Sequence, residues 1–134
     1  MEILENVLSI DKIKHLQELG VNTGNASMTW MLYPYEEGKQ PQLSLREWGT
    51  FKEPFRKEHC IPAFTLLDIL KLLPKEIETG TDTYWITMYF SDNCWHICYS
   101  MSDEFDYYQE FSSYSLIDAS YEMLCWCVEE RLIP

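Results

Sequence analysis

The chain has 134 residues, with 10 Lys and Arg against 22 Asp and Glu, and its formal net charge is −12 at pH 7. This balance argues against nucleic-acid binding, because neutralising phosphates requires clustered cations and the sequence has no Lys/Arg cluster. Hydrophobic residues make up 46% of the chain and aromatic residues 15%, which is enough apolar surface to build a core and argues against disorder. We therefore expect one folded domain over residues 1–134.

The cellular location is predicted from two absences and from the cysteines. No apolar stretch approaches the roughly 20 residues that cross a bilayer, and residues 1–5 are acidic where a secretory signal would be basic. The five cysteines are odd in number and lack the spacing of a disulfide scaffold. We expect a cytoplasmic protein with reduced thiols and no membrane contact.

The first half of the chain predicts one helix and two strands. Ser9 precedes an amphipathic helical pattern that ends at Gly20, which is typical of an N-cap and a C′ glycine. Residues 28–33 form a strand-like run, and a weaker strand is expected over residues 42–48. Prolines and mixed charges over residues 49–63 predict an irregular connection.

The second half predicts two helices, each opened by a pattern that resembles a capping box. In both patterns a Thr or Ser is followed three residues later by Asp, in the place where Glu is usual. The first pattern is Thr65 to Asp68, and it opens a short apolar helix over residues 66–73. The second begins at Ser115, and its helix is expected to reach about Glu130.

Residues 84–90 and 94–100 predict the clearest hairpin. One possible register pairs Phe90 with Cys94, and another pairs Phe90 with Trp95. Only the second register gathers the apolar side chains of both strands on one face, so the hydrophobic pattern selects it.

A third strand is expected over residues 107–111, which brings the expected total to about five strands and about three helices. The apolar face of the hairpin needs a cover of other apolar side chains. The most economical fold is therefore α+β, with a single antiparallel sheet and helices packed mainly on one face.

Three segments carry a resemblance to a known family: Ser9–Asn22 with Ala26–Met28, Ile61–Ile77, and Ser115–Trp126. The chain resembles a family of small uncharacterised proteins from gut bacteria and their phages or mobile elements. The family has no assigned activity, so the resemblance implies a bacterial or phage accessory context and transfers no mechanism. The three segments coincide with helices and caps, which points to shared fold rather than shared chemistry.

The pattern Cys94-Trp-His96-Ile-Cys98 is the best candidate for chemistry. On a strand these three side chains share one face, and thiolate and imidazole are ligands that zinc prefers. The wide spacing along a strand and the lack of a fourth ligand favour buried thiols beside a hydrogen-bonded histidine. A Cys–His nucleophile would lack a third group to orient the imidazole. We assign no metal, cofactor or catalytic residue, and a small enzyme or metal-dependent protein using this Cys/His site is the alternative.

Four residues are candidates for binding: Trp85, Tyr89, His96 and Trp126. The hairpin face with Trp85, Tyr89 and His96 is too aromatic for simple solvation and too polar for a simple core. Either other segments cover it or it serves as a recognition platform. Trp126 falls off the apolar stripe of the last helix, where either packing on two sides or a partner-binding anchor would explain it.

The function expected from these features is protein binding. The sequence contains no P-loop, dinucleotide glycine motif, G-x-S-x-G elbow or H-E-x-x-H helix, which favours a non-enzymatic protein. We expect a monomer or dimer whose negative field engages a basic protein partner, such as a nuclease, toxin or DNA-binding protein, in an inhibitor or immunity-like role. The simpler alternative is that the charge only secures solubility.

Overall fold

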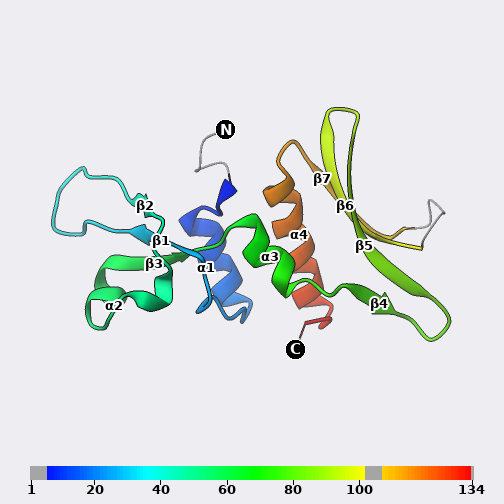
Figure 1. Ribbon diagram of the computed structural model, residues 1–134, viewed down its shortest axis with the longest axis horizontal. Helices are drawn as coiled ribbons and strands as arrows, with labels where there is room; N and C mark the ends of the chain where they lie inside the picture. The colour runs from blue at the N-terminus through cyan, green and yellow to red at the C-terminus, as the bar shows by residue number, and fades with distance from the viewer. Residues whose placement is uncertain (1–5, 102–106, 134) are drawn as a thin grey trace. The chain divides into compact units, whose positions relative to one another are not determined.

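The computed structural model describes residues 6–101 and 107–133. The chain divides into two compact units, Met1–Asp68 and Ile69–Pro134. The described residues form four α-helices and two antiparallel sheets, one of three strands and one of four (Figure 1). The predicted α+β class is confirmed. The predictions of a single sheet, of about five strands and of about three helices are wrong, because the described residues form seven strands in two sheets and four α-helices.

The first unit contains the three-stranded sheet, in which β1 lies between β2 and β3. Its helix α1 begins after Ser9, whose side chain accepts a hydrogen bond from the backbone N–H of Lys12. The helix ends before Gly20, which has a φ of 91°, so both predicted ends are confirmed. The elements are α1 (Ile10–Glu18), β1 (Met28–Met31), β2 (Gln42–Ser44), the 3₁₀ helix η2 (Trp48–Thr50), α2 (Phe55–His59) and β3 (Cys60–Ala63).

The expectation of an irregular connection over residues 49–63 is wrong. Helix α2 begins directly after Pro54, and β3 contains Pro62 and pairs with β1. Proline is tolerated at the start of a helix and in an edge strand, because neither position needs its missing N–H. Pro54 therefore lies directly before α2, and Pro62 lies within the edge strand β3.

The predicted capping box at Thr65 is confirmed and opens α3 (Leu66–Leu72). The backbone N–H of Thr65 donates to Asp68 Oδ2 at 2.9 Å, and the N–H of Asp68 donates to Thr65 Oγ1 at 3.3 Å. Asp68 also accepts from the backbone N–H of Ser27 at 3.0 Å and from its hydroxyl at 2.5 Å. This buried carboxylate therefore joins the start of α3 to the residue before β1.

The second unit contains the four-stranded sheet, with strand order β4-β5-β6-β7. Its elements are β4 (Glu76–Glu78), β5 (Thr83–Ser91), β6 (Cys94–Ser100), β7 (Tyr107–Ser113) and α4 (Leu116–Glu129). Figure 1 shows β5 and β6 as a long, curled hairpin. Strand β4 was not predicted, whereas the third predicted strand is present as β7.

The register of the hairpin is the predicted one, with Phe90 opposite Trp95. The strands are joined by Asp92 and Asn93, whose φ angles are 53° and 63°. Two consecutive positive φ angles are typical of a type I′ turn, which matches the right-handed twist of a hairpin and tolerates Asp and Asn.

Helix α4 packs on β6 and β7. It begins after Ser115, whose side chain accepts from the N–H of Asp118, so this predicted cap is also confirmed. Tyr99 of β6 is fully buried. Its hydroxyl donates to the carbonyl oxygen of Pro74 at 2.7 Å and lies 4.0 Å from Cys127 Sγ of α4. The apolar face of the hairpin is therefore the one that α4 covers.

Within the described ranges, no helix combines the length and the apolar character that crossing a bilayer requires.

Candidate functional site

The candidate site is the face of the four-stranded sheet that lies opposite α4, called here the polar face. Directly opposed residues of antiparallel strands point to the same side of a sheet. The observed registers therefore place the following residues on this face: Glu76, Trp85, Thr87, Tyr89, His96, Cys98, Glu110 and Ser112.

Exposure varies along the polar face. Trp85 is 45% exposed, whereas Cys98 is completely buried. The side chain of His96 is 14% exposed. The sequence left open whether this face is covered or free, and the structure shows an open end at Trp85 and a covered centre at Cys98.

The imidazole of His96 is held from three sides. The Tyr89 ring stacks on it, with ring centroids 4.6 Å apart and an angle of 10° between the planes. Nε2 lies 3.1 Å from the carbonyl oxygen of Ser91, and Nδ1 lies 2.6 Å from Ser112 Oγ. A carbonyl oxygen can only accept, so Nε2 carries a proton, and in the neutral imidazole Nδ1 is the acceptor for the Ser112 hydroxyl.

Glu110 of β7 connects this histidine to the tyrosines. One carboxylate oxygen accepts from the Tyr89 hydroxyl at 2.7 Å, and the other lies 3.7 Å from His96 Nδ1. The hydroxyls of Tyr89 and Tyr107 are 3.3 Å apart. The hydrogen bond with Tyr107, burial, and the neighbouring Glu110 raise the pKa of Tyr89 well above its ordinary value. Tyr89 is therefore a neutral hydrogen-bond donor at physiological pH.

The ring nitrogens of His96 contact Ser91 and Ser112, and Nδ1 also lies near the Glu110 carboxylate. Cys94 and Cys98, with which the sequence groups His96, are not these partners. Cys98 lies on the same face, where burial raises the pKa of its thiol. A raised pKa lowers the thiolate fraction, and the thiolate is the nucleophile and the metal ligand. Within residues 6–101 and 107–133, no group of three or more His, Cys, Asp or Glu side chains is placed to hold a metal ion.

Trp126 lies apart from the other three candidate residues. It is on α4, where its ring meets that of Tyr108 edge to face, with centroids 5.8 Å apart and an angle of 69°. Packing between α4 and β7 thus explains why this tryptophan falls off the main apolar stripe. The structure brings Tyr89 and His96 together and places Trp85 further along the same face.

The end of the hairpin exposes apolar side chains as well. Phe90 is 57% exposed, and its ring meets that of Trp95 edge to face at 5.3 Å. Met88, on the same face as Phe90, is also exposed. Large exposed aromatic side chains are enriched in protein interfaces.

The charge of the chain is concentrated in the second unit. Between Lys75 and Arg131 the sequence has 12 Asp and Glu and no Lys or Arg. Glu76 and Glu110, which sequence reasoning missed as site residues, belong to this stretch and lie on the polar face. A local charge count along the sequence would have indicated them, whereas the total charge does not.

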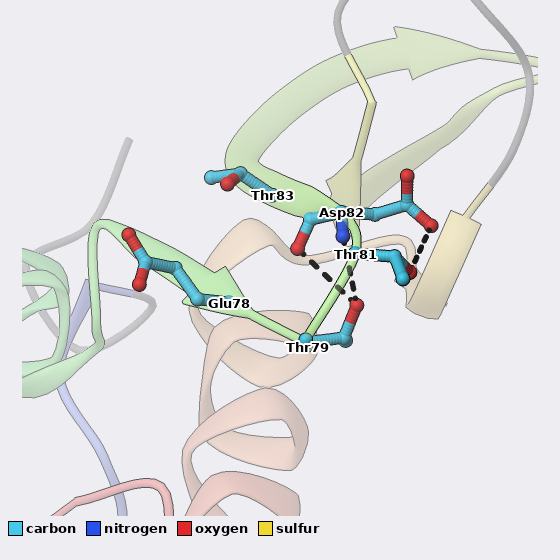
Figure 2. Close-up of a pocket in the computed structure, with 6 residues that line it drawn as sticks. Glu78, Thr79, Thr81, Asp82 and Thr83 are labelled. Carbon is cyan, nitrogen blue, oxygen red and sulfur yellow. Dashed lines mark hydrogen bonds between the residues drawn. The ribbon is translucent and has the colours of Figure 1, made fainter.

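A small open pocket lies at the turn between β4 and β5, lined by residues 78–83 (Figure 2). The backbone N–H of Thr79 donates to the carbonyl oxygen of Asp82 at 2.8 Å, and the N–H of Asp82 donates to Thr79 Oγ1 at 3.2 Å. Thr81 Oγ1 donates to the Asp82 carboxylate at 3.2 Å. These bonds close the turn on itself, so the pocket is the inner side of a turn and we assign no ligand to it.

Comparison of the chain with protein-family models, with curated proteins and with solved structures gives no match. The chemistry of the polar face is therefore what supports a function. That face combines an exposed tryptophan, a tyrosine and a histidine in a hydrogen-bonded network, and carboxylates that belong to the stretch 76–130, which has no Lys or Arg.

Proposed function

We propose that the protein is a non-enzymatic binding protein and that its second unit engages a basic protein partner. The observation that carries this proposal is the 55-residue stretch 76–130, which holds 12 acidic residues and no Lys or Arg. A field of one sign attracts a partner of the opposite sign, speeds its association and discourages acidic partners.

The polar face supplies the contact surface for this partner. Trp85 is exposed and lies opposite Glu76 in the β4–β5 pairing, so an apolar anchor and a carboxylate are neighbours. Tryptophan is enriched at interfaces, where its ring buries a large area while its N–H keeps a polar contact. Tyr89 and His96 are already held by hydrogen bonds, which lowers the entropy lost when a partner orders them.

The acidic charge and the aromatic side chains of the second unit suggest a specific form of this function, and the sequence resemblance implies only a bacterial or phage accessory context for it. A small acidic protein with an aromatic and acidic face is suited to mask the cationic surface of a nuclease, toxin or DNA-binding protein. An inhibitor or immunity-like role is therefore the form that we propose.

The experiment is affinity capture from a bacterial lysate with the tagged full chain, at low and at moderate salt, with mass spectrometry of the retained proteins. Trp85→Ala is compared with Tyr35→Ala, because Tyr35 is 85% exposed and lies in the first unit. We expect the wild type and Tyr35→Ala to retain one basic protein that salt releases, and Trp85→Ala to retain clearly less. An empty capture, or equal retention by all three proteins, would contradict the proposal.

One observation favours a second candidate, a small hydrolase centred on Ser112. Its hydroxyl contacts His96 Nδ1 at 2.6 Å, and the Ser91 carbonyl orients the ring through Nε2, which is the geometry of a nucleophile, a base and an orienting group. Hydrolysis of p-nitrophenyl acetate that Ser112→Ala abolishes would favour this candidate. Equal rates for the wild type and Ser112→Ala would exclude Ser112 as the nucleophile for this substrate.

A further inference from the structure

Strand β7 forms one edge of the four-stranded sheet. It pairs with β6 on one side, and no other described strand pairs with it on the other. An edge strand presents backbone N–H and C=O groups that can pair with a strand from another chain.

The other sheet edges are protected in ways that β7 is not. Strand β4 has three residues, and two of them are glutamates. Strand β2 also has three residues, and β3 contains Pro62. Short length, charge and proline all discourage strand addition. Strand β7 has seven residues, Tyr107–Ser113, with no proline and one charged residue, Glu110.

The hydrogen bonds of β7 show which groups face outward. The backbone N–H of Glu110 donates to the side-chain oxygen of Gln109 at 2.9 Å, so it points away from β6. In an antiparallel ladder the inward and outward positions alternate. The N–H of Ser112 therefore faces the same free side as the N–H of Glu110. Of these two donors, the Glu110 N–H is already bonded to the side-chain oxygen of Gln109.

We propose that the free edge of β7 accepts an extended, Lys- or Arg-bearing segment of the partner as an added strand. This inference rests on the proposed function, since the basic partner is the one that the charge of residues 76–130 selects. Backbone hydrogen bonds to the Glu110 and Ser112 amides supply the binding, and alternate side chains of the added strand supply the specificity.

The surroundings of β7 fit a cationic strand. Tyr114 directly follows β7 and is 84% exposed, and an exposed aromatic ring attracts Lys and Arg through the cation–π interaction. Pairing of β7 with a second copy of this chain would bring together two second units, each with 12 acidic residues and three Lys and Arg. Repulsion between these units disfavours such a dimer.

The probe is a fluorescein-labelled peptide of about ten residues with Lys at alternate positions and Val or Thr between them. Its control replaces each Val and Thr with Pro, which keeps the charge and removes the N–H groups and the strand conformation. In fluorescence anisotropy with the full chain, we expect the Lys–Val/Thr peptide to bind at least about tenfold more tightly than the Lys–Pro peptide.

Two variants of β7 should shift this affinity in opposite directions. Gln109→Ala frees the Glu110 N–H, so binding should tighten by up to about fivefold, whereas the matched variant Gln40→Ala, in an exposed loop, should bind as the wild type does. Ser112→Pro removes an outward N–H from an edge position where proline is tolerated, so binding should weaken. If Ser112→Pro fails to fold, the gain from Gln109→Ala still tests the proposal.

The outcomes separate strand addition from the broader function. Equal affinity for the two peptides, absent binding of both, or no effect of Gln109→Ala would overturn strand addition, while capture of a basic protein from lysate would still support the proposed function. A dimer in light scattering whose β7 amides are protected from exchange without peptide would show that a second copy occupies the edge, and would also overturn the inference.

Discussion

Tyr89 is the residue that joins the parts of the polar face, because its ring stacks on His96 and its hydroxyl donates to Glu110. Tyr89→Phe keeps the ring and removes the donor to a partly buried carboxylate. We expect the free energy of unfolding in urea to fall by about 1–2 kcal/mol. Tyr35→Phe, at a position that is 85% exposed, should leave the free energy of unfolding unchanged. Equal stability of both variants would show that the Tyr89 hydroxyl contributes nothing.

Cys127 makes the stability of the second unit sensitive to alkaline pH. Burial raises the pKa of its thiol from 9.0 to about 11, so the unfolded chain loses this proton at a lower pH than the folded chain does. The stabilisation is complete below pH 9 and is lost as the pH rises towards 11. Urea unfolding between pH 8 and pH 11 should show a shallower loss of stability for Cys127→Ala than for the wild type. Identical pH slopes would contradict this assignment.

At the scale of single residues, the sequence predicts the strand face on which a side chain lies better than it predicts the residues that the side chain contacts. The twofold period of a strand places Trp85, Tyr89 and His96 on one side of the hairpin, as observed. Their contacts with Glu110 and Ser112 depend on the register of β7 against β6, which includes an irregularity between Tyr99 and Ser100. No local pattern in the sequence indicates that register.

At the scale of elements, the predictable features are those with local causes. The Ser9, Thr65 and Ser115 caps depend on residues within one turn, and the hairpin depends on a two-residue turn with alternating strands. Helix α2 and strand β3 are not predicted from the sequence, because Pro54 before the helix and Pro62 within the strand are typical of segments without regular structure. Strand β4 has three residues and is defined by its pairing with β5, which a local pattern does not reveal.

Loss of the Asp68 side chain should strongly affect the start of α3. This side chain caps α3 through Thr65 and accepts two hydrogen bonds from Ser27, while being buried. Asp68→Ala leaves the partly buried donors of Ser27 and Thr65 without this acceptor, so we expect a loss of about 2–4 kcal/mol in the free energy of unfolding. Glu47→Ala, an exposed carboxylate, is the control. A loss below about 0.5 kcal/mol, typical of surface positions, would contradict the role of Asp68.

At the scale of the whole chain, composition predicts the α+β class but not the division of strands between two sheets. The predicted elements are compatible with one sheet, because pairing between strands far apart in the sequence leaves no local signal. Strands β2 and β3 instead each pair with β1, within residues 28–63. The expectations of one domain and of a monomer or dimer remain predictions.

The uneven distribution of charge is the feature of the whole molecule that most directly bears on function. The second unit holds 12 of the 22 acidic residues but only three of the 10 Lys and Arg. If the charge served only solubility, replacing acidic residues of the first unit would have the same effect as replacing acidic residues of the second unit. A role in partner binding makes those of the second unit the important ones.

The most direct test is therefore a matched charge reversal in the capture experiment. Glu76→Lys/Glu78→Lys changes two exposed residues of β4 in the second unit, and Glu37→Lys/Glu47→Lys changes two exposed residues of the first unit by the same total charge. We predict that the first pair loses most of the captured basic protein and that the second pair retains it. Equal loss in both pairs would show that net charge alone attracts the partner, and would contradict a binding surface on the second unit.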